Sequence, residues 1–184
     1  MASDGATVLV VDDEENITAL FDAWLAENHE VRTANSGTEA LESIDESVDV
    51  ALLDRRMPGL SGDELLEEIR ERDVDVRVAM VTAVDPDFDV VEMGFDDYLT
   101  KPISRDDLEA VVEKLHSRKH YDEDLQEYYS LAAKKAALEA SKPASELAES
   151  EEYDRLLADL DAVESALDGQ LSDEDDFVSA FQDI

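Results

Sequence analysis

Five short strand-like runs that alternate with helical stretches constrain the fold of this 184-residue chain more than any other feature. The runs are rich in β-branched and apolar residues, which is typical of strands buried on both faces of a sheet. They lie at residues 7–11, 31–34, 50–53, 78–81 and 97–100. Strands that alternate with helices predict a parallel sheet with helices on both sides. We therefore expect an α/β domain with a doubly wound, five-stranded parallel sheet.

The stretch between the fourth and fifth runs differs from the other connections. The earlier connections and the stretch after the fifth run carry apolar residues at helical spacing, and Ser36 and Ser104 are placed to cap two of these helices. Only eleven residues separate Thr82 from Gly94. This length predicts a short helix with Pro86 in its first turn rather than a full one.

After about residue 117 the strand pattern stops, and apolar residues recur at alternating steps of three and four. Pro143 is expected to end a first helix and Ser150 to cap a second, with Gly169 at the C-terminal end of the second. A last helix is expected from Ser172. We therefore predict two domains, an α/β domain at residues 1–117 and a small all-helical domain at residues 118–184.

The chain is strongly acidic, with 50 acidic and 15 basic residues and a net charge of −35. The charge is spread evenly, because residues 1–120 already hold 31 acidic and 11 basic residues. An even spread predicts adaptation to a salty cytoplasm, where a Debye length of about 3 Å or less screens self-repulsion. Lys134-Lys135 is the only paired basic cluster after residue 120, so nucleic-acid binding is not supported, although screening keeps it open. With no membrane-length apolar run, we expect a cytoplasmic protein.

Polar residues follow four of the five predicted strands. Asp12 and Asp13 follow the first, Asp54 the third, Thr82 ends the fourth and Lys101 follows the fifth. In open parallel sheets, ligands bind outside the carboxyl ends of the strands, which is where these residues lie. Three carboxylates require a cation, and Mg²⁺ suits their oxygens. Each aspartate alone could merely cap a helix, but the five residues together favour a site in which Asp54 attacks phosphorus while Lys101 and Thr82 bind phosphoryl oxygens.

The residues that carry a family resemblance are Val11-Asp12-Asp13-Glu14, Leu53-Asp54-Arg55-Arg56-Met57-Pro58-Gly59 with Gly62, Thr82-Ala83 and Lys101-Pro102. Together they resemble the motifs of two-component response-regulator receiver domains, over about residues 7–116. The resemblance implies a CheY-like, flavodoxin-like fold. The roles that it implies are phosphoacceptor for Asp54, Mg²⁺ ligands for Asp12, Asp13, Asp54 and the backbone carbonyl of Arg56, switch hydroxyl for Thr82, phosphoryl contact for Lys101 and switch aromatic for Tyr98.

The tail is similar to the HalX domain found behind receivers in halophilic archaea, a domain without a well-defined activity. The features that match are Leu125 and Tyr128, the segment from Lys134 to Glu139, the stripe Tyr153-Leu156-Leu157-Leu160 and the pair Phe177 and Phe181. The receiver resemblance implies a phosphorelay response regulator whose partner is a sensor histidine kinase and whose output is related to transcription. It implies phosphorylation and dephosphorylation of the protein itself, not a metabolic enzyme.

Several alternatives stay open at this point. A scaffold with a vestigial pocket would bind its partner without phosphorylation. A phosphatase with an aspartate nucleophile is disfavoured, because Asp12-Asp13-Glu14 lacks a second aspartate two residues after the first.

A homodimer could form through the receiver or the C-terminal helices, although the short segment after Thr82 argues against the receiver face. Two other sets of residues have plain expected roles: Arg55 and Arg56 would steer a phosphodonor or aid solubility, and His29, His116 and His120 would be solvated rather than form a metal site.

Overall fold

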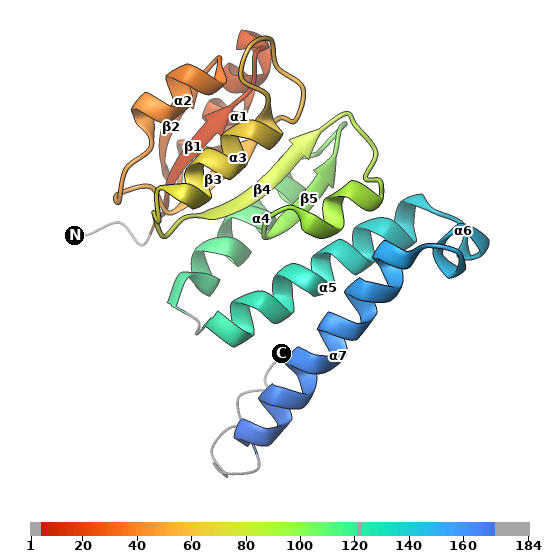
Figure 1. Ribbon diagram of the computed structural model, residues 1–184. Helices are drawn as coiled ribbons and strands as arrows, with labels where there is room; N and C mark the ends of the chain where they lie inside the picture. Colours follow the sequence, from red (N-terminus) through yellow and green to blue (C-terminus); the bar gives the residue numbers. More distant parts are fainter. Residues whose placement is uncertain (1–4, 121–122, 172–184) are drawn as a thin grey trace.

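The computed structural model describes residues 5–120 and 123–171 and contains one sheet of five parallel strands in the order β2-β1-β3-β4-β5 (Figure 1). The strands are β1 (Thr7–Val11), β2 (Glu30–Ala34), β3 (Val50–Leu53), β4 (Arg77–Thr82) and β5 (Asp97–Thr100). In the register of the sheet, Leu9 of β1 lies opposite Arg32 on one side and Ala51 on the other. The predicted doubly wound parallel sheet is confirmed.

Four helices cover the two faces of this sheet: α1 (Glu15–Leu25), α2 (Gly37–Ser43), α3 (Gly62–Glu71) and α4 (Arg105–Ser117). Two separate apolar clusters show which helix covers which face. Phe21 of α1 and Leu108 of α4 pack with Val10 of β1, whereas Leu66 of α3 packs with Leu9 on the opposite face. Successive strand residues point to opposite faces, so each buried strand contributes to both clusters.

Serine side chains fix the beginnings of three of these helices. Ser36 and Ser104 each accept a hydrogen bond from the backbone N–H three residues later, as their positions in the sequence predict. Ser61 forms a capping box with Glu64 at the start of α3, because each side chain accepts a bond from the other residue's backbone N–H. The start of α3 is thereby fixed beside the loop that follows β3.

The connection between β4 and β5 holds only a short 3₁₀ helix, η1 (Phe88–Glu92). The side chain of Asp87 accepts a hydrogen bond of 2.8 Å from the backbone N–H of Phe88 and caps it. The prediction of a short helix is confirmed, but Pro86 precedes its cap instead of lying in its first turn. So short an element covers little of the sheet beside β5.

The C-terminal helices cover the part of the sheet beside β5 that η1 leaves open. After η2 (Arg118–His120) the chain forms α5 (Glu123–Ser141), α6 (Ala144–Ala148) and α7 (Glu151–Leu171). The helix α5 contacts β5 and η1, while α7 packs against α5 and η1, so the two form an antiparallel hairpin on this side (Figure 1). We call residues Glu123–Leu171 the C-terminal hairpin.

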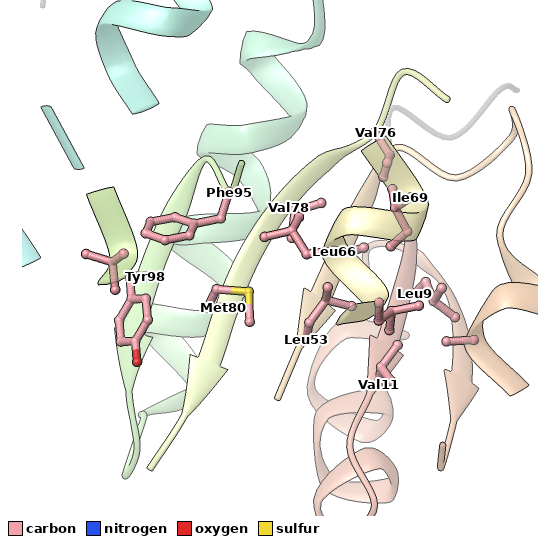
Figure 2. Packing of buried hydrophobic residues seen from close by; sticks show 14 of the residues in the cluster. Leu9, Val11, Leu53, Leu66, Ile69, Val76, Val78, Met80, Phe95 and Tyr98 are labelled. Atoms are coloured by element: carbon pink, nitrogen blue, oxygen red, sulfur yellow. The ribbon is translucent and has the colours of Figure 1, made fainter. Parts of the chain in front are cut away.

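One apolar cluster runs without a break from the sheet into the C-terminal hairpin. Leu138 of α5 and Leu156 of α7 are fully buried in the cluster that contains Met80 and Phe95 (Figure 2). Burying a leucine side chain contributes about 1.5–3 kcal/mol. The hairpin therefore shares a core with the sheet, and the division into domains 1–117 and 118–184 stays a prediction.

The start of α7 agrees with the prediction for the tail, and its end does not. Ser150 caps α7, as predicted, by accepting a bond from the backbone N–H of Tyr153. Gly169 does not end this helix, because α7 continues to Leu171. The last predicted helix, with Phe177 and Phe181, lies outside the described residues. Among the helices that the structure describes, none has the length and apolar character that a bilayer span requires.

Candidate functional site

The predicted site residues meet at the carboxyl edge of the sheet. Asp12 and Asp13 directly follow β1, Asp54 follows β3, Thr82 is the last residue of β4 and Lys101 directly follows β5. These strands are hydrogen-bonded neighbours in the order β1-β3-β4-β5, so their ends lie side by side. The sheet topology thus places five polar side chains around one point.

The loop between β3 and α3 holds the start of α3 against Asp54. The backbone N–H of Gly62 donates a 2.8 Å hydrogen bond to the carbonyl of Arg55. A Cβ atom on Gly62 would lie 1.9 Å from the backbone oxygen of Asp54, which is well inside any tolerable contact. Only glycine fits at this position, and its close approach fixes the N-terminus of α3 beside Asp54.

Three carboxylates form the centre of the site. Oxygen atoms of Asp12, Asp13 and Asp54 all lie within 4.8 Å of one another. Asp12 and Asp54 are buried while Asp13 is exposed, so the cluster opens to solvent on one side. Like charges at this separation repel strongly, and a cation bound among them would relieve the repulsion. The donors are all oxygens, which fits a hard divalent ion such as Mg²⁺.

Lys101 is the ammonium group nearest to these carboxylates. Its Nζ atom lies 2.5 Å from Oδ2 of Asp12 and 3.7 Å from Oδ2 of Asp54. Even with this partner, three carboxylates and one ammonium leave a net charge of about −2. The site therefore retains the charge that a divalent cation would balance.

The environment of Asp54 acts on its pKa in both directions. Burial is the largest influence and raises the pKa of the carboxyl above its usual value. The Thr82 hydroxyl and the Lys101 ammonium oppose this effect, whereas the charge of Asp12 adds to it. On balance the pKa of Asp54 is raised, because desolvation penalises the carboxylate more than its partners stabilise it.

A cleft of about 590 Å³ gives access to the centre, and its lining includes Asp13, Asp54, Arg56, Thr82 and Lys101. Thr82 is fully buried, and its Oγ1 accepts a 3.3 Å hydrogen bond from the backbone N–H of Val84. The structure thus brings Arg56 and Thr82 to the same cleft as the carboxylate of Asp54. A neighbouring cleft of about 740 Å³ lies between the β3–α3 and β4–η1 loops.

Tyr98 lies behind this edge and faces the protein interior. Its hydroxyl donates a 2.5 Å hydrogen bond to the backbone carbonyl of Val84, and its ring packs 5.5 Å from the ring of Phe95 (Figure 2). Burial raises the pKa of the Tyr98 hydroxyl, so this group stays a hydrogen-bond donor. Val84 thereby links the predicted switch aromatic to the predicted switch hydroxyl of Thr82.

Arg55 lies beside the site as expected, but its burial and its partners were not predicted from the sequence. It is buried, and its guanidinium donates to Asp63 at 2.9 and 2.8 Å, to Asp89 at 2.6 Å and to the Tyr98 hydroxyl at 3.4 Å. The paired carboxylate of Asp63, the largest influence, raises the pKa of Arg55 further above its usual value. The solubility role expected for Arg55 is wrong, because the side chain is buried and ties the loop after β3 to η1, whereas donor steering stays a prediction.

The histidines also differ from the expectation that they are solvated. Nδ1 of His29 accepts a 3.0 Å hydrogen bond from the backbone N–H of Ala6. Nε2 of His29 and Nδ1 of His116 are buried without a hydrogen-bond partner among the described residues. Burial lowers the pKa of His29 and keeps it neutral at pH 7. Both side chains are half-buried, and the side chain of His120 is not described.

Comparisons with known proteins agree with this geometry. Residues 8–113 match the family model "response regulator receiver domain", and residues 117–181 match the model of the HalX domain. A Haloferax volcanii protein named "Putative transcriptional regulator" is 49% identical over 157 residues, which cover 85% of this chain and 27% of that protein. The Bacillus subtilis alkaline phosphatase synthesis transcriptional regulatory protein PhoP is 39% identical, with 60% of this chain and 48% of PhoP covered.

Solved structures extend the comparison to the site. The response regulator TrrA of Thermotoga maritima, in complex with Mg²⁺-BeF, is 36% identical and superposes with a TM-score of 0.52 over 60% of this chain and 98% of TrrA. The chain spans about a quarter and about half of the two curated relatives. The relative from Haloferax and the HalX match confirm the expectation of a halophilic source.

Proposed function

The chain belongs to the response-regulator receiver family, with a HalX domain behind the receiver, and from this premise we propose that Asp54 accepts a phosphoryl group from a sensor histidine kinase. The observation that carries the proposal is the convergence of Asp12, Asp13 and Asp54 with Lys101 at the carboxyl edge of the sheet. A carboxylate can act as a nucleophile towards phosphorus and form an acyl phosphate.

Mg²⁺ is the cofactor that this donor set fits. Asp12, Asp13, Asp54 and the backbone carbonyl of Arg56 are the groups that would hold the ion. When bound, it would balance the charge that develops on the phosphoryl oxygens. The fit rests on the oxygen-only donors and on the negative charge that Lys101 leaves uncompensated. The related TrrA structure is a complex with Mg²⁺-BeF, which supports the same ion for this family.

The transfer step assigns a role to each residue of the cleft. An Oδ atom of Asp54 forms a bond to phosphorus while the bond from phosphorus to the donor imidazole breaks. The imidazole leaves with the electron pair and takes a proton from solvent. Lys101 pairs with one phosphoryl oxygen as a point charge, and Thr82 donates its hydroxyl hydrogen to another. Such preorganised donors stabilise the charge of the transition state.

We propose that the output is a change in protein partners linked to transcription. The two curated relatives are named as transcriptional regulators. In the C-terminal hairpin (Glu123–Leu171) the cations are Lys134, Lys135, Lys142 and Arg155, and Lys134 is buried. The remaining three lie within 4.0 Å of carboxylates, so they form no basic face for a phosphate backbone. Protein contacts therefore account for the output better than direct contacts to DNA.

An intact-mass measurement tests the phosphoacceptor. The protein is incubated with acetyl phosphate in multimolar KCl, with and without Mg²⁺. The proposal predicts a gain of one phosphoryl group that needs Mg²⁺ and is lost in Asp54→Asn. Equal gains in the wild type and the variant would refute it. Equal partner binding by the wild type and Asp54→Ala would instead favour the scaffold with a vestigial pocket.

A further inference from the structure

The side chain of Asn35 reaches from the loop after β2 to the backbone beside the carboxylate cluster. Its Nδ2 atom donates a 3.1 Å hydrogen bond to the backbone carbonyl of Asp12. We propose that Asn35 is a positioning residue, which holds the peptide between Asp12 and Asp13 and so keeps the Asp13 carboxylate within reach of a divalent cation. This inference rests on the proposed function, in which Asp12 and Asp13 are ligands of Mg²⁺.

Asp12 is held at each of its polar groups. Its backbone N–H donates a 3.1 Å hydrogen bond to the carbonyl of Ala34, the last residue of β2. Its Oδ1 atom accepts a 2.9 Å hydrogen bond from the backbone N–H of Glu14, and its Oδ2 atom pairs with Lys101 at 2.5 Å. The bond from Asn35 to the carbonyl completes the set. Two of the four partners of Asp12 therefore come from the end of β2.

Asp13 has no such support of its own. It is exposed, and none of the described residues forms a hydrogen bond or an ion pair with its carboxylate. The oxygens of Asp12 and Asp54 lie within 4.8 Å and carry the same charge, so repulsion favours a rotation of the Asp13 side chain towards solvent. The backbone must therefore aim this carboxylate at the cluster. The planar peptide between Asp12 and Asp13 is the part of the backbone that Asn35 holds.

The other contacts of Asn35 fix which end of its amide faces Asp12. Nδ2 also donates a 3.0 Å hydrogen bond to Oγ1 of Thr18 on α1, and the Thr18 hydroxyl donates its own hydrogen to the carbonyl of Glu15. Both partners of Nδ2 can therefore only accept, which requires the NH₂ end of the amide at this place. The backbone N–H of Asn35 donates to Glu39 of α2 at 3.1 Å. Asn35 is thus anchored between α1 and α2 and presents a fixed donor to Asp12.

The next residue, Ser36, offers a matched control within the same loop. Its side chain caps α2 by accepting a 3.1 Å hydrogen bond from the backbone N–H of Glu39, and it forms no hydrogen bond with Asp12 in the described structure. Loss of this cap destabilises α2. Ser36→Ala therefore loosens the loop and leaves the Asp12 carbonyl held, whereas Asn35→Ala releases the carbonyl.

Thermal unfolding of the full chain in multimolar KCl, with Mg²⁺ titrated in, separates positioning from a purely structural role. The midpoint without Mg²⁺ reports the structural cost of each variant, and the rise of the midpoint with Mg²⁺ gives the dissociation constant. We expect Asn35→Ala to raise the dissociation constant by about tenfold, the lower range for groups that orient metal ligands. Ser36→Ala should lower the midpoint and keep the dissociation constant. With acetyl phosphate, Asn35→Ala should need about tenfold more Mg²⁺ for its half-maximal rate and reach the wild-type rate at saturation.

An unchanged dissociation constant in Asn35→Ala overturns the inference even if its midpoint falls, and so does an equal rise in Ser36→Ala. If Asn35→Ala does not fold, Asn35→Leu, which keeps the shape of the side chain without the donor, takes its place. A wild type that binds Mg²⁺ but gains no phosphoryl group refutes the proposed phosphoacceptor, and a weaker dissociation constant in Asn35→Ala still supports positioning. A wild type that Mg²⁺ does not stabilise overturns both the cofactor and the role of Asn35.

Discussion

Lys101 pairs more closely with Asp12 than with Asp54, because its Nζ atom lies 2.5 Å from Oδ2 of Asp12 and 3.7 Å from Oδ2 of Asp54. The lysine therefore stabilises the charge of Asp54 from a longer distance than that of Asp12. Under the proposed function, we expect Lys101 to turn from Asp12 towards the phosphoryl oxygens, an exchange that a cation among the carboxylates would favour. Asp12 is buried and the Lys101 side chain is 16% exposed, so the pair is largely shielded from solvent.

Replacement of this lysine should slow phosphorylation without unfolding the protein. We expect Lys101→Met to react with acetyl phosphate about a hundredfold more slowly, the usual loss when one preorganised donor is removed. The rate is measured by intact mass at fixed Mg²⁺. The control is Lys114→Met, which removes a lysine of α4 that pairs with Asp97 of β5. This variant should react like the wild type. Equal rates for the two variants would contradict the role of Lys101.

Mg²⁺ should stabilise the folded protein through the exposed carboxylate of Asp13. At an ion concentration of 100 times the dissociation constant, the free energy of unfolding should rise by about 2.7 kcal/mol. Thermal unfolding in multimolar KCl, with Mg²⁺ titrated in, measures the effect. Asp13→Asn should remove most of the response, and Glu42→Gln, an exposed acid on α2, should keep it. A response that survives in Asp13→Asn would place the ion elsewhere.

Two glycine substitutions should change stability in opposite directions. Gly62→Ala places a methyl group 1.9 Å from the Asp54 backbone oxygen and should destabilise the protein by about 1–3 kcal/mol or more. Gly169→Ala adds a methyl group within α7, where the described residues beyond its own helix turn place no atom within 4 Å, and should stabilise the protein by up to about 1 kcal/mol. Urea unfolding followed by circular dichroism gives both values. A neutral Gly62→Ala would show that α3 does not press on the acceptor loop.

The shared core predicts that the hairpin and the sheet unfold together. Leu156 is fully buried in the cluster that contains Phe95, whereas its neighbour Leu157 is 36% exposed. We expect Leu156→Ala to lower the free energy of unfolding by about 2–5 kcal/mol and Leu157→Ala by far less. Both a helix signal and the fluorescence of Trp24 on α1 should report one transition. Two separate transitions would show that the hairpin is an independent unit.

Alkaline pH should weaken the hairpin through Tyr153. Its hydroxyl donates a 2.7 Å hydrogen bond to Glu139, and burial together with this carboxylate raises the pKa of Tyr153 to about 12. The protonated phenol is favoured by folding, so its stabilising effect is complete below about pH 10, the usual pKa of tyrosine, and is lost between about pH 10 and 12. Melting temperatures across this range should fall more steeply for the wild type than for Tyr153→Phe. Parallel curves would refute the assignment.

Much of the site could be predicted because parallel strands end at one edge. Asp54, Thr82 and Lys101 each lie at or just past the end of a recognisable strand, so a local pattern predicted a convergence that the structure confirms. Their chemical roles stay proposals, since geometry alone shows no transfer of phosphate.

Arg55 and Lys134 show where sequence reasoning ends. The partners of Arg55 are 8, 34 and 43 residues away, so no local spacing marks it as buried. Lys134 sits in an apolar helix stripe, but the surface that this stripe covers depends on the short connection between β4 and β5. The prediction that this connection is short is confirmed. That the short connection leaves room for α5 to pack on β5 and η1 could be seen only in the folded structure.

Mapping the acyl phosphate to its residue tests the central claim most directly. The protein is phosphorylated with acetyl phosphate and Mg²⁺ in multimolar KCl, reduced with borohydride, which converts an aspartyl phosphate to homoserine, and digested for peptide mass analysis. The account predicts conversion at Asp54 alone, dependent on Mg²⁺ and on Lys101. Conversion at another aspartate, or none at Asp54 in folded protein, would contradict it.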